Sequence, residues 1–491
     1  MQYTPFGKPW FAHQQSHFEK HKDSEIWGLL WEQGTAKTKP VLDTMSYLYQ
    51  QKKITGMIVV APPGVERNWL SDEIPEHCHP EIRNEIEAFV WKSNRVGTKD
   101  HTYRFDRLIK HNGLSVLLIS YNAFITENAK KALWRFLRRR VCLFVLDEAH
   151  NIKTAAAKRT KSIVAAGKYA VYRRIMTGTP ISNSPFDIYP QIRFLDNNFW
   201  KDRGIHTYAE FKQHFGVWRL REEVKREKGY DPKYDQLLSY KNLDQLKGWI
   251  DEVTDRVTKD EVLDLPPKLY QKRYYALSSA QEALYNELRD EYIAELNGEL
   301  IDGSLAIVRL LRLQQIICGY VKTETDDLDD EPVRLIGNSN PRIECLRDVC
   351  EQVTGQCLIW ARFRKDVDQI MEILGDDAVR YDGTITDDQA EQNKKLFQLG
   401  KKKWFVGTAS KGGPGLTLHM AKTVIYYNNS FKLIDRLQSE DRAHRAGMDE
   451  HPVNYIDICC HDTVDDKIIK NLRSKVDIAS KLTGDELKEW L

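Results

Sequence analysis

Short apolar runs alternate with longer amphipathic stretches along the first part of the chain. Five of these runs predict buried strands that end in polar loops, at 26–30, 57–63, 116–120, 142–150 and 172–180. Helical patterns such as PVLDTMSYLYQQ lie between them. A strand followed by a helix, repeated, is typical of a parallel α/β sheet. Ligands of such sheets bind beyond the carboxyl ends of the strands, where these polar loops fall.

The pattern changes in the middle of the chain and then returns. Residues from about 190 to 335 are mostly helical and charged, and we expect 221–235 and 323–331 to be solvated insertions or loops. Four strands of a second sheet are predicted afterwards, at 357–363, 378–383, 403–410 and 423–429. Residues from Asp465 onward predict one or two helices. The predicted fold is therefore α/β, with two parallel-sheet lobes and helical insertions between and within them.

Composition narrows the class of protein without identifying its function. Charged residues make up 29% and hydrophobic residues 41% of the chain, as in ordinary soluble globular proteins. The net charge of +2 gives no overall basic field, so nucleic-acid binding would need local patches. The eight cysteines form no CxxC pair, which argues against a zinc site and favours free thiols. With no apolar signal core or membrane span, we expect a cytoplasmic protein.

The segment WEQGTAKTKP, residues 31–40, lies where a phosphate-binding loop would. It follows a strand and precedes an amphipathic helix, so backbone N–H groups would cradle phosphates. Lys37 would reach the β- and γ-phosphates, and Thr38 would ligate Mg²⁺. Such loops normally carry Gly before the Lys, whereas this chain has Ala36. We expect Ala36 to have a negative φ and ATP affinity to be near normal, because a positive φ would cost roughly 1–2 kcal/mol. Taken alone, the segment also fits an ordinary strand–helix turn.

An acidic pair follows another predicted strand, in LFVLDEAH. Asp147 can hold the Mg²⁺ shell, and Glu148 can orient or deprotonate an attacking water. A chance tetrapeptide is the alternative, but the candidate phosphate loop upstream argues against it.

The motifs, taken in order, resemble the helicase core of superfamily two. More narrowly, they resemble Swi/Snf-type DNA translocases, in a compact form like bacterial or phage members. The matching segments are AHQQ (12–15), VVAPPGVERNW (59–69), LISYNAF (118–124), DEAHNIK (147–153), MTGTPISN (176–183), LPPK (265–268), SSAQEALYNEL (278–288), LIWARFRKDVDQI (358–370), RYDG (380–383), GTASKGGPGLTL (407–418) and QSEDRAHRAG (438–447). The resemblance implies two RecA-like lobes.

The resemblance also assigns expected roles to residues. Catalysis would use Glu148, Gln438, Arg442 and Arg445. ATP and Mg²⁺ would be bound by Gln14, which would read adenine, and by Gly34, Thr35, Ala36, Lys37, Thr38 and Asp147. Coupling would involve His150, Thr177, Gly178, Thr179, Gly415 and Asp441.

The last motif carries two arginines three residues apart. If the segment is helical, Arg442 and Arg445 share one helix face. Two guanidiniums aimed at a γ-phosphate would stabilise the charge that develops as it leaves, an effect on the order of 10³–10⁵ in rate. The resemblance implies that hydrolysis is coupled to lobe motion. Surface salt bridges are the alternative role for these arginines.

Duplex DNA is the partner that the resemblance implies, held by its backbone without base readout. The candidate contacts are Ser120, Tyr121, Lys153, Arg362, Ser410, Lys411 and Thr417. Each could also be a solvated loop residue. Lys411 departs from the family, which usually has a small residue there, and its extra charge could strengthen phosphate contact or be neutral.

The sequence therefore predicts an ATP- and Mg²⁺-dependent motor that translocates on double-stranded DNA and remodels DNA or protein–DNA complexes. A strand-separating DNA or RNA helicase is the first alternative, and a DNA-binding scaffold with a decayed ATPase is the second. Forked or branched DNA is a further candidate substrate, and no protein partner is indicated. The expected domains are lobe one (1–195), a helical insertion and bridge (196–275), a helical insertion of lobe two (276–340), lobe two (341–464) and a C-terminal helical brace (465–491).

Overall fold

The computed structural model describes residues 3–228, 235–298, 303–322, 333–411, 416–445, 448 and 451–483. Within these residues the chain forms two compact units. Unit 1 is built mainly from the residues up to Gly216 and from 240–264, and unit 2 mainly from 265–477. None of the helices in the described ranges is both long and apolar enough to cross a membrane.

Unit 1 contains a parallel sheet of seven described strands in the order β3-β4-β2-β5-β6-β1-β9. The strands are β1 (Ile26–Leu29), β2 (Gly56–Ala61), β3 (Ile86–Val90), β4 (Leu114–Ser120), β5 (Cys142–Asp147), β6 (Tyr172–Met176) and β9 (Thr254–Asp255). All five strands predicted for this part are present, and the apolar runs of β2, β4 and β5 are almost wholly buried. Strands β3 and β9, which form the two edges of the sheet, were not predicted.

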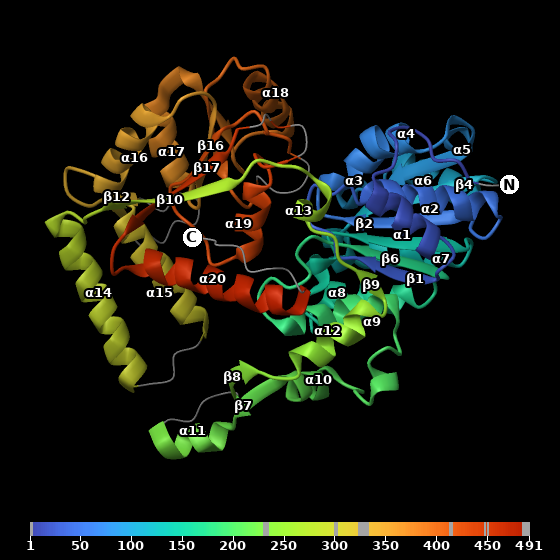
Figure 1. Ribbon diagram of the computed structural model, residues 1–491, viewed down its shortest axis with the longest axis horizontal. Helices are drawn as coiled ribbons and strands as arrows, with labels where there is room; N and C mark the ends of the chain where they lie inside the picture. Colours follow the sequence, from blue (N-terminus) through green and yellow to red (C-terminus); the bar gives the residue numbers. More distant parts are fainter. Residues whose placement is uncertain are drawn as a thin grey trace. The chain divides into compact units, whose positions relative to one another are not determined.

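Helices connect these strands (Figure 1). They are α1 (Ala12–His21), α2 (Thr38–Gln50), α3 (Val65–Asn68), α4 (Ile74–His77), α5 (Pro80–Asn84), α6 (Lys99–Lys110), α7 (Glu127–Leu137), α8 (Lys158–Gly167), α9 (Tyr189–Leu195), α10 (Tyr208–Phe215), α12 (Leu243–Asp251) and α13 (Lys259–Val262). Helix α2 packs Val41, Leu42 and Met45 into a core with side chains of β2 and β4. This packing fixes the helix that begins at the end of the candidate phosphate loop.

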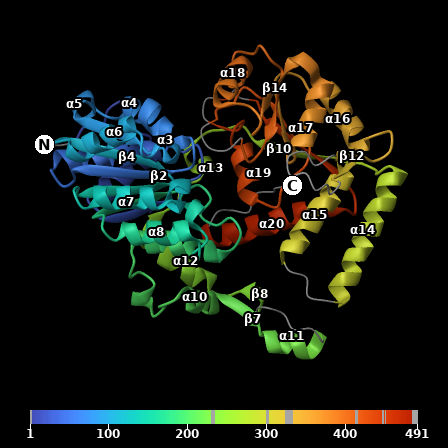
Figure 2. The same cartoon turned by 180° about the vertical axis from the view of Figure 1, so that it is seen from behind.

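Unit 2 contains a sheet of six described strands in the order β10-β17-β16-β13-β15-β14, and every adjacent pair is parallel. The strands are β10 (Lys268–Tyr275), β13 (Cys357–Ala361), β14 (Ala378–Tyr381), β15 (Trp404–Thr408), β16 (Thr423–Tyr426) and β17 (Val453–Cys460). The helices are α14 (Ser279–Gly298), α15 (Gly303–Ile317), α16 (Pro341–Gln352), α17 (Arg364–Leu374), α18 (Asp387–Gln398), α19 (Leu433–Glu440) and α20 (Val464–Thr483). Helices α14 and α15 run side by side (Figure 2). The two parallel sheets confirm the predicted fold class.

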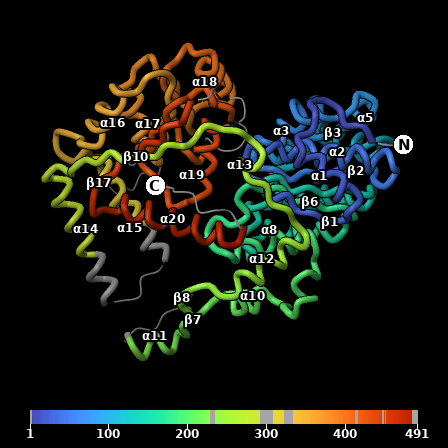
Figure 3. Tube along the Cα trace, in the orientation of Figure 1, coloured from blue at the N-terminus to red at the C-terminus, as the bar shows by residue number. Residues whose placement is uncertain are grey.

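The middle of the chain is less purely helical than predicted. Besides its helices it contains two strands that pair with each other, β7 (Gly216–Arg219) and β8 (Gln236–Tyr240), with α11 (Arg221–Lys228) between them in sequence. A second small pair, β11 (Tyr320–Lys322) and β12 (Val333–Leu335), is antiparallel. The acidic stretch 323–331 lies outside the described residues. Figure 3 traces the chain from α12 through α13 into β10.

Candidate functional site

The candidate phosphate loop runs from the end of β1 to the start of α2, as its sequence predicts. Thr35 Oγ1 donates to the Glu32 carbonyl at 2.7 Å. Lys37 Nζ donates to the carbonyls of Trp31 and Glu32, at 3.0 and 2.9 Å. The lysine therefore folds back over the loop, and Thr38 is the first residue of α2, where helical N–H groups lack helical acceptors. Both residues are where phosphate and Mg²⁺ chemistry would need them.

The prediction for the Ala36 backbone was wrong. Its φ is 57°, in the left-handed region, and Gly34 two residues earlier also has a positive φ of 84°. Two hydrogen bonds hold the carbonyls on either side of this turn: His13 Nε2 lies 3.0 Å from the Thr35 oxygen, and Gln14 Nε2 donates to the Ala36 oxygen at 2.8 Å. Helix α1 thus fixes the loop in a conformation that glycine would adopt without strain.

The side-chain amide of Gln14 forms hydrogen bonds to the backbone through both its oxygen and its nitrogen. Its Oε1 accepts from the Phe11 N–H at 2.9 Å while its Nε2 holds the loop, and the side chain is buried. Its expected role in reading adenine stays a prediction. The sequence analysis did not find His13, although it neighbours Gln14 in the same motif.

A later segment extends the sheet beside the phosphate loop. The Leu30 N–H donates to the Asp255 oxygen at 2.9 Å, and the Glu32 N–H donates to the Val257 oxygen at 2.8 Å. Glu32 Oε2 in turn accepts from the Lys259 N–H at 2.6 Å, at the start of α13. Glu32 therefore joins the loop to the segment that leaves unit 1. No motif marks this role, because the partners are more than 220 residues apart in sequence.

The acidic pair follows β5, and its two carboxyl groups have different surroundings. Trp69 Nε1 donates to Asp147 Oδ2 at 3.0 Å, and the Tyr121 hydroxyl donates to the Asp147 backbone oxygen at 2.9 Å. Burial and the adjacent charge of Glu148 raise the pKa of Asp147 to about 6. Glu148 has a left-handed φ of 54°, and its Oε2 lies 3.2 Å from His150 Nδ1. Two neighbouring carboxyls, of which Glu148 is buried and Asp147 half-buried, form a place where a divalent cation would be favourable.

The predicted coupling residues connect this pair to β6. His150 Nδ1 lies 3.1 Å from Thr177 Oγ1, which also accepts from the Thr179 N–H at 3.2 Å. At Gly178 an added Cβ would come within 2.8 Å of the Gln33 backbone nitrogen. Only glycine allows the TGTP segment to approach the phosphate loop this closely.

Unsatisfied polar atoms at this junction fit an ATP·Mg²⁺ site. Both polar atoms of the Gln33 side chain and Thr179 Oγ1 are buried and lack a hydrogen-bond partner in the described part of the chain. Lys37, Thr38 and Asp147 together supply the cation, hydroxyl and carboxylate that phosphates and Mg²⁺ use. The residues present therefore fit ATP and Mg²⁺.

The unit 1 residues expected to touch DNA differ in exposure. Ser120 is half-buried at the end of β4, whereas the Tyr121 side chain is fully buried and supports Asp147. Lys153 Nζ donates to Ser182 Oγ at 2.7 Å. In this conformation Tyr121 offers no side-chain surface to a ligand, and Ser120 and Lys153 remain candidates.

In unit 2, the motif with the two arginines is not helical at the arginines. Helix α19 ends at Glu440, so the condition for one shared helix face is not met. Arg442 Nη1 nevertheless donates to the Leu416 oxygen at 3.1 Å, and Arg445 Nη1 donates to Thr417 Oγ1 at 3.2 Å. Both side chains reach adjacent residues of the preceding motif. Gln438 is buried on α19, and Asp441 is its half-buried C-cap.

Glu440, which the sequence analysis did not assign, lies at the centre of a buried charge network. Its carboxylate accepts from Lys268 Nζ, the Tyr270 hydroxyl and Arg436 Nε, at 2.9, 2.8 and 2.7 Å. Burial alone would raise the pKa of Glu440, but the charges of Lys268 and Arg436 lower it to about 2. Arg436 also pairs with Asp457. The network joins the LPPK segment to the helix that precedes the arginines.

The unit 2 residues expected to bind DNA are partly engaged within the protein. Lys411 Nζ donates to the Asp382 oxygen at 2.6 Å, so its charge holds the loop after β14. Arg362 is half-buried and bonds to the Gln314 side chain. Ser410 is exposed. Thr417 is half-buried, and its hydroxyl accepts the hydrogen bond from Arg445. Gly415 lies outside the described residues.

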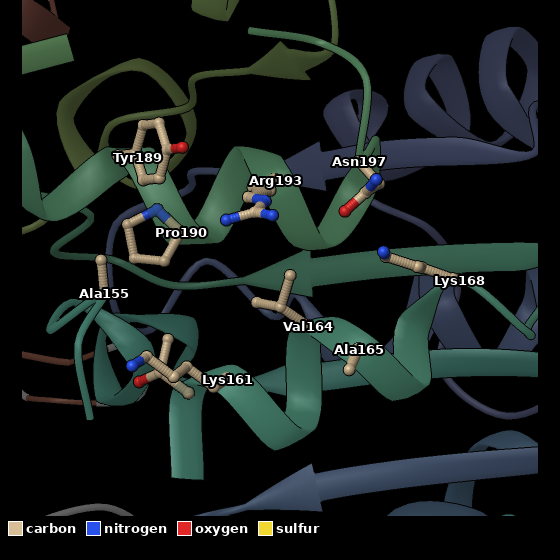
Figure 4. A pocket seen from close by; sticks show the side chains of 10 residues that line it. Ala155, Lys161, Val164, Ala165, Lys168, Tyr189, Pro190, Arg193 and Asn197 are labelled. Atoms are coloured by element: carbon tan, nitrogen blue, oxygen red, sulfur yellow. The ribbon is translucent and has the colours of Figure 1, made fainter. Parts of the chain in front are cut away.

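A pocket of about 270 Å³ lies between α8 and α9, and none of the predicted site residues lines it (Figure 4). Figure 4 shows Arg193 of α9 and Lys161 and Lys168 of the α8 segment around it. The pocket is therefore separate from the candidate nucleotide site.

Two protein families match the chain over most of its length. The SNF2-related domain matches residues 11–319, and the helicase conserved C-terminal domain matches residues 341–447. The first match alone covers more than half of the chain.

Several curated proteins are similar to the chain. The transcription regulatory protein SNF2 of Saccharomyces cerevisiae is 24% identical over 94% of this chain and 28% of its own length. A mouse SWI/SNF-related matrix-associated actin-dependent regulator of chromatin (subfamily A member 1) is 25% identical over 94% of this chain and 43% of its own length. An uncharacterized ATP-dependent helicase of Mycoplasma genitalium is 23% identical over 94% of this chain and 40% of its own length. The chain thus spans between a quarter and a half of these relatives.

Among solved structures, the Sulfolobus solfataricus SWI2/SNF2 ATPase core in complex with dsDNA is 19% identical, with a TM-score of 0.41, over 99% of this chain and 95% of that one. The family assignment rests on the domain matches, which follow the same order as the motifs. They confirm the resemblance seen in the sequence: the chain belongs to the SNF2-related family.

Proposed function

We propose that the protein is a DNA-stimulated ATPase that translocates on double-stranded DNA and remodels DNA or protein–DNA complexes. The observation that carries the proposal is that the phosphate loop, the acidic pair and the TGTP segment meet at the carboxyl ends of β1, β5 and β6, three neighbouring strands of the unit 1 sheet. Its support is the close approach at Gly178 and the hydrogen bonds that join Asp147, His150 and Thr177 to their neighbours.

The proposal assigns a separate role to each group of side chains. Lys37 and the N–H groups at the start of α2 bind the β- and γ-phosphates of ATP. Glu148 orients the attacking water and accepts its proton, while His150 and Thr177 hold Glu148 and its loop in place. Thr38 and Asp147 would hold Mg²⁺, which supplies positive charge at the phosphates. Arg442 and Arg445 of unit 2 contribute charge to the γ-phosphate as it leaves.

Family membership supports duplex DNA as the partner. Curated relatives include regulators of transcription and chromatin and an ATP-dependent helicase. Ser120, Lys153, Ser410 and Thr417 are the backbone-contact candidates that the proposal retains, because their polar groups lie at or beyond strand ends.

Two alternatives have specific support. A strand-separating helicase is favoured by the helicase C-terminal domain match and by relatives named helicases. A scaffold with a decayed ATPase is favoured by the strained Ala36 backbone. Release of a labelled strand from a forked duplex with ATP alone would support the first alternative, and absence of ATP turnover would support the second.

ATP turnover measured with and without a blunt duplex tests the proposal. We expect duplex DNA to stimulate wild-type turnover, and Lys37→Ala and Glu148→Gln to lose at least a hundredfold. Glu127→Gln is the matched control, because Glu127 is an exposed acid in the same unit that pairs with Lys130 on its own helix. If both site variants turn over like Glu127→Gln, the assignment of the ATP site fails.

A further inference from the structure

A second pocket in unit 1 is lined by an unusual number of cations. It has a volume of about 280 Å³ and lies among the α3 segment, the end of β3 and helix α6. Its cationic lining residues are Arg67, Lys92, Arg95 and Arg104, and its acidic one is Asp100. In the described part of the chain, none of these four cations forms an ion pair with a carboxylate.

The cations are close enough to affect one another. Burial and then the nearby charges of Arg67, Arg95 and Arg104 lower the pKa of Lys92. Arg104 additionally lies over the Phe89 ring, 5.9 Å from its centroid. Four like charges around one hollow repel each other, and an anion bound among them would relieve that repulsion.

A buried histidine provides a second and independent observation. His101 lines the same pocket and is only 6% exposed, and its Nε2 has no hydrogen-bond partner among the described residues. Its ring packs edge-on against Phe89 and Trp91, which hold it in place. A buried polar atom without a partner is costly unless a ligand or water satisfies it.

The pocket is distinct from the nucleotide loop. Its lining comes from the α3 segment, the end of β3 and helix α6, while the loop follows β1. The pocket and the loop share no residue.

We propose that this pocket is a phosphate-binding site. Arginine guanidiniums match phosphate oxygens in pairs of parallel hydrogen bonds, and Lys92 adds a point charge. The phosphate group can come from the backbone of DNA or from a free polyphosphate such as pyrophosphate. The site does not depend on ATP hydrolysis, because it shares no residue with the nucleotide loop.

Direct binding without ATP tests the site and separates the two sources. The test variant is Lys92→Ala with Arg104→Ala, and the matched control is Lys161→Ala with Lys168→Ala, two cations of the Figure 4 pocket in the same unit. Pyrophosphate binding is measured by calorimetry in a Lys37→Ala background, so that the nucleotide loop does not contribute. Duplex DNA binding is measured against salt concentration, with a Lys92→Arg, Arg104→Lys variant to show that charge is what matters.

We expect the test variant to lose at least tenfold in affinity for one of the two ligands, and the charge-preserving variant to lose less. If DNA is the source, the slope of log affinity against log salt also falls by about 1.8, for two lost phosphate contacts. Loss for pyrophosphate alone identifies a free-anion site, and loss for DNA alone or for both identifies a site open to the backbone. Unchanged binding of both ligands, or an equal loss in the control, would overturn the proposal. Binding remains measurable if the chain does not hydrolyse ATP, so a failure of the proposed function is distinguishable.

Discussion

Replacing Ala36 with glycine tests whether the phosphate loop stores backbone strain. Ala36 has a φ of 57°, and its side chain is exposed, so the substitution removes strain and almost no packing. A left-handed conformation costs an L-residue roughly 1–2 kcal/mol. The extra freedom of glycine in the unfolded chain costs about 0.5–1 kcal/mol. The difference predicts that Ala36→Gly stabilises unit 1 by about 0.5–1 kcal/mol.

Hydrogen exchange of the α2 amides reports this change locally, which matters because a chain with two compact units is not expected to unfold in one two-state transition. A gain of this size slows the most protected amides roughly two- to fivefold. The affinity for ATP should change less than threefold, because the loop already has its left-handed turn and binding relieves no further strain. Nucleotide affinity is measured on the same samples by calorimetry.

Ala156→Gly serves as the control for the effect of glycine itself. Ala156 is also exposed, in a turn, but it does not have a positive φ. Glycine there should destabilise unit 1 by about 0.5–1 kcal/mol, the opposite sign. If Ala36→Gly also speeds exchange, the strain argument is refuted. If ATP binds Ala36→Gly more than tenfold tighter, nucleotide binding adds strain at Ala36, contrary to this expectation.

Three other substitutions test single contacts. Glu440→Gln should destabilise unit 2 by about 3 kcal/mol at pH 7, because it removes the carboxylate partner of Lys268 and leaves Arg436 with Asp457 as its remaining carboxylate partner. Since the folded pKa of Glu440, about 2, is below its usual 4.5, its stabilisation is complete above pH 4.5 and is lost between pH 4.5 and 2. The free energy of unfolding of the variant should therefore fall less than that of the wild type between pH 4.5 and 2. The same fall in both proteins would contradict the role of Glu440 in the network. Glu32→Ala should raise the KM for ATP about three- to tenfold by freeing the loop from the Lys259 N–H, and an unchanged KM would exclude this positioning role. Tyr121→Phe should lower kcat up to about tenfold with DNA affinity intact, whereas a loss of DNA affinity alone would restore Tyr121 as a DNA contact.

Several strands could be predicted because they are buried on both faces. β2 and β5 form continuous apolar runs, and both lie in the interior of the unit 1 sheet. Strand β3 is only partly buried at an edge, and β9 has two residues, so neither produces a run of that kind. Burial was not sufficient, because the interior strand β17 is almost wholly buried and was not predicted, whereas the edge strand β14 was.

The parts of the candidate site that could be predicted are those set by residues close together in the sequence. The motifs predicted Lys37 and Thr38 at the start of a helix and Asp147 and Glu148 at the end of a strand, where the structure has them. The φ of Ala36 was predicted with the wrong sign because hydrogen bonds from His13 and Gln14 set it, and these depend on how α1 packs. The same limit applies to Glu32, whose partner Lys259 becomes a neighbour only through tertiary folding.

The pairing of β9 with β1 has a consequence for folding during synthesis. During synthesis the strand that carries the phosphate loop emerges more than 220 residues before the strand that covers its edge. Until then β1 is an open sheet edge next to the loop, and such edges can pair with other chains. A fragment that ends near residue 195 would keep this exposed edge permanently, so it should aggregate more readily than one that extends past α13.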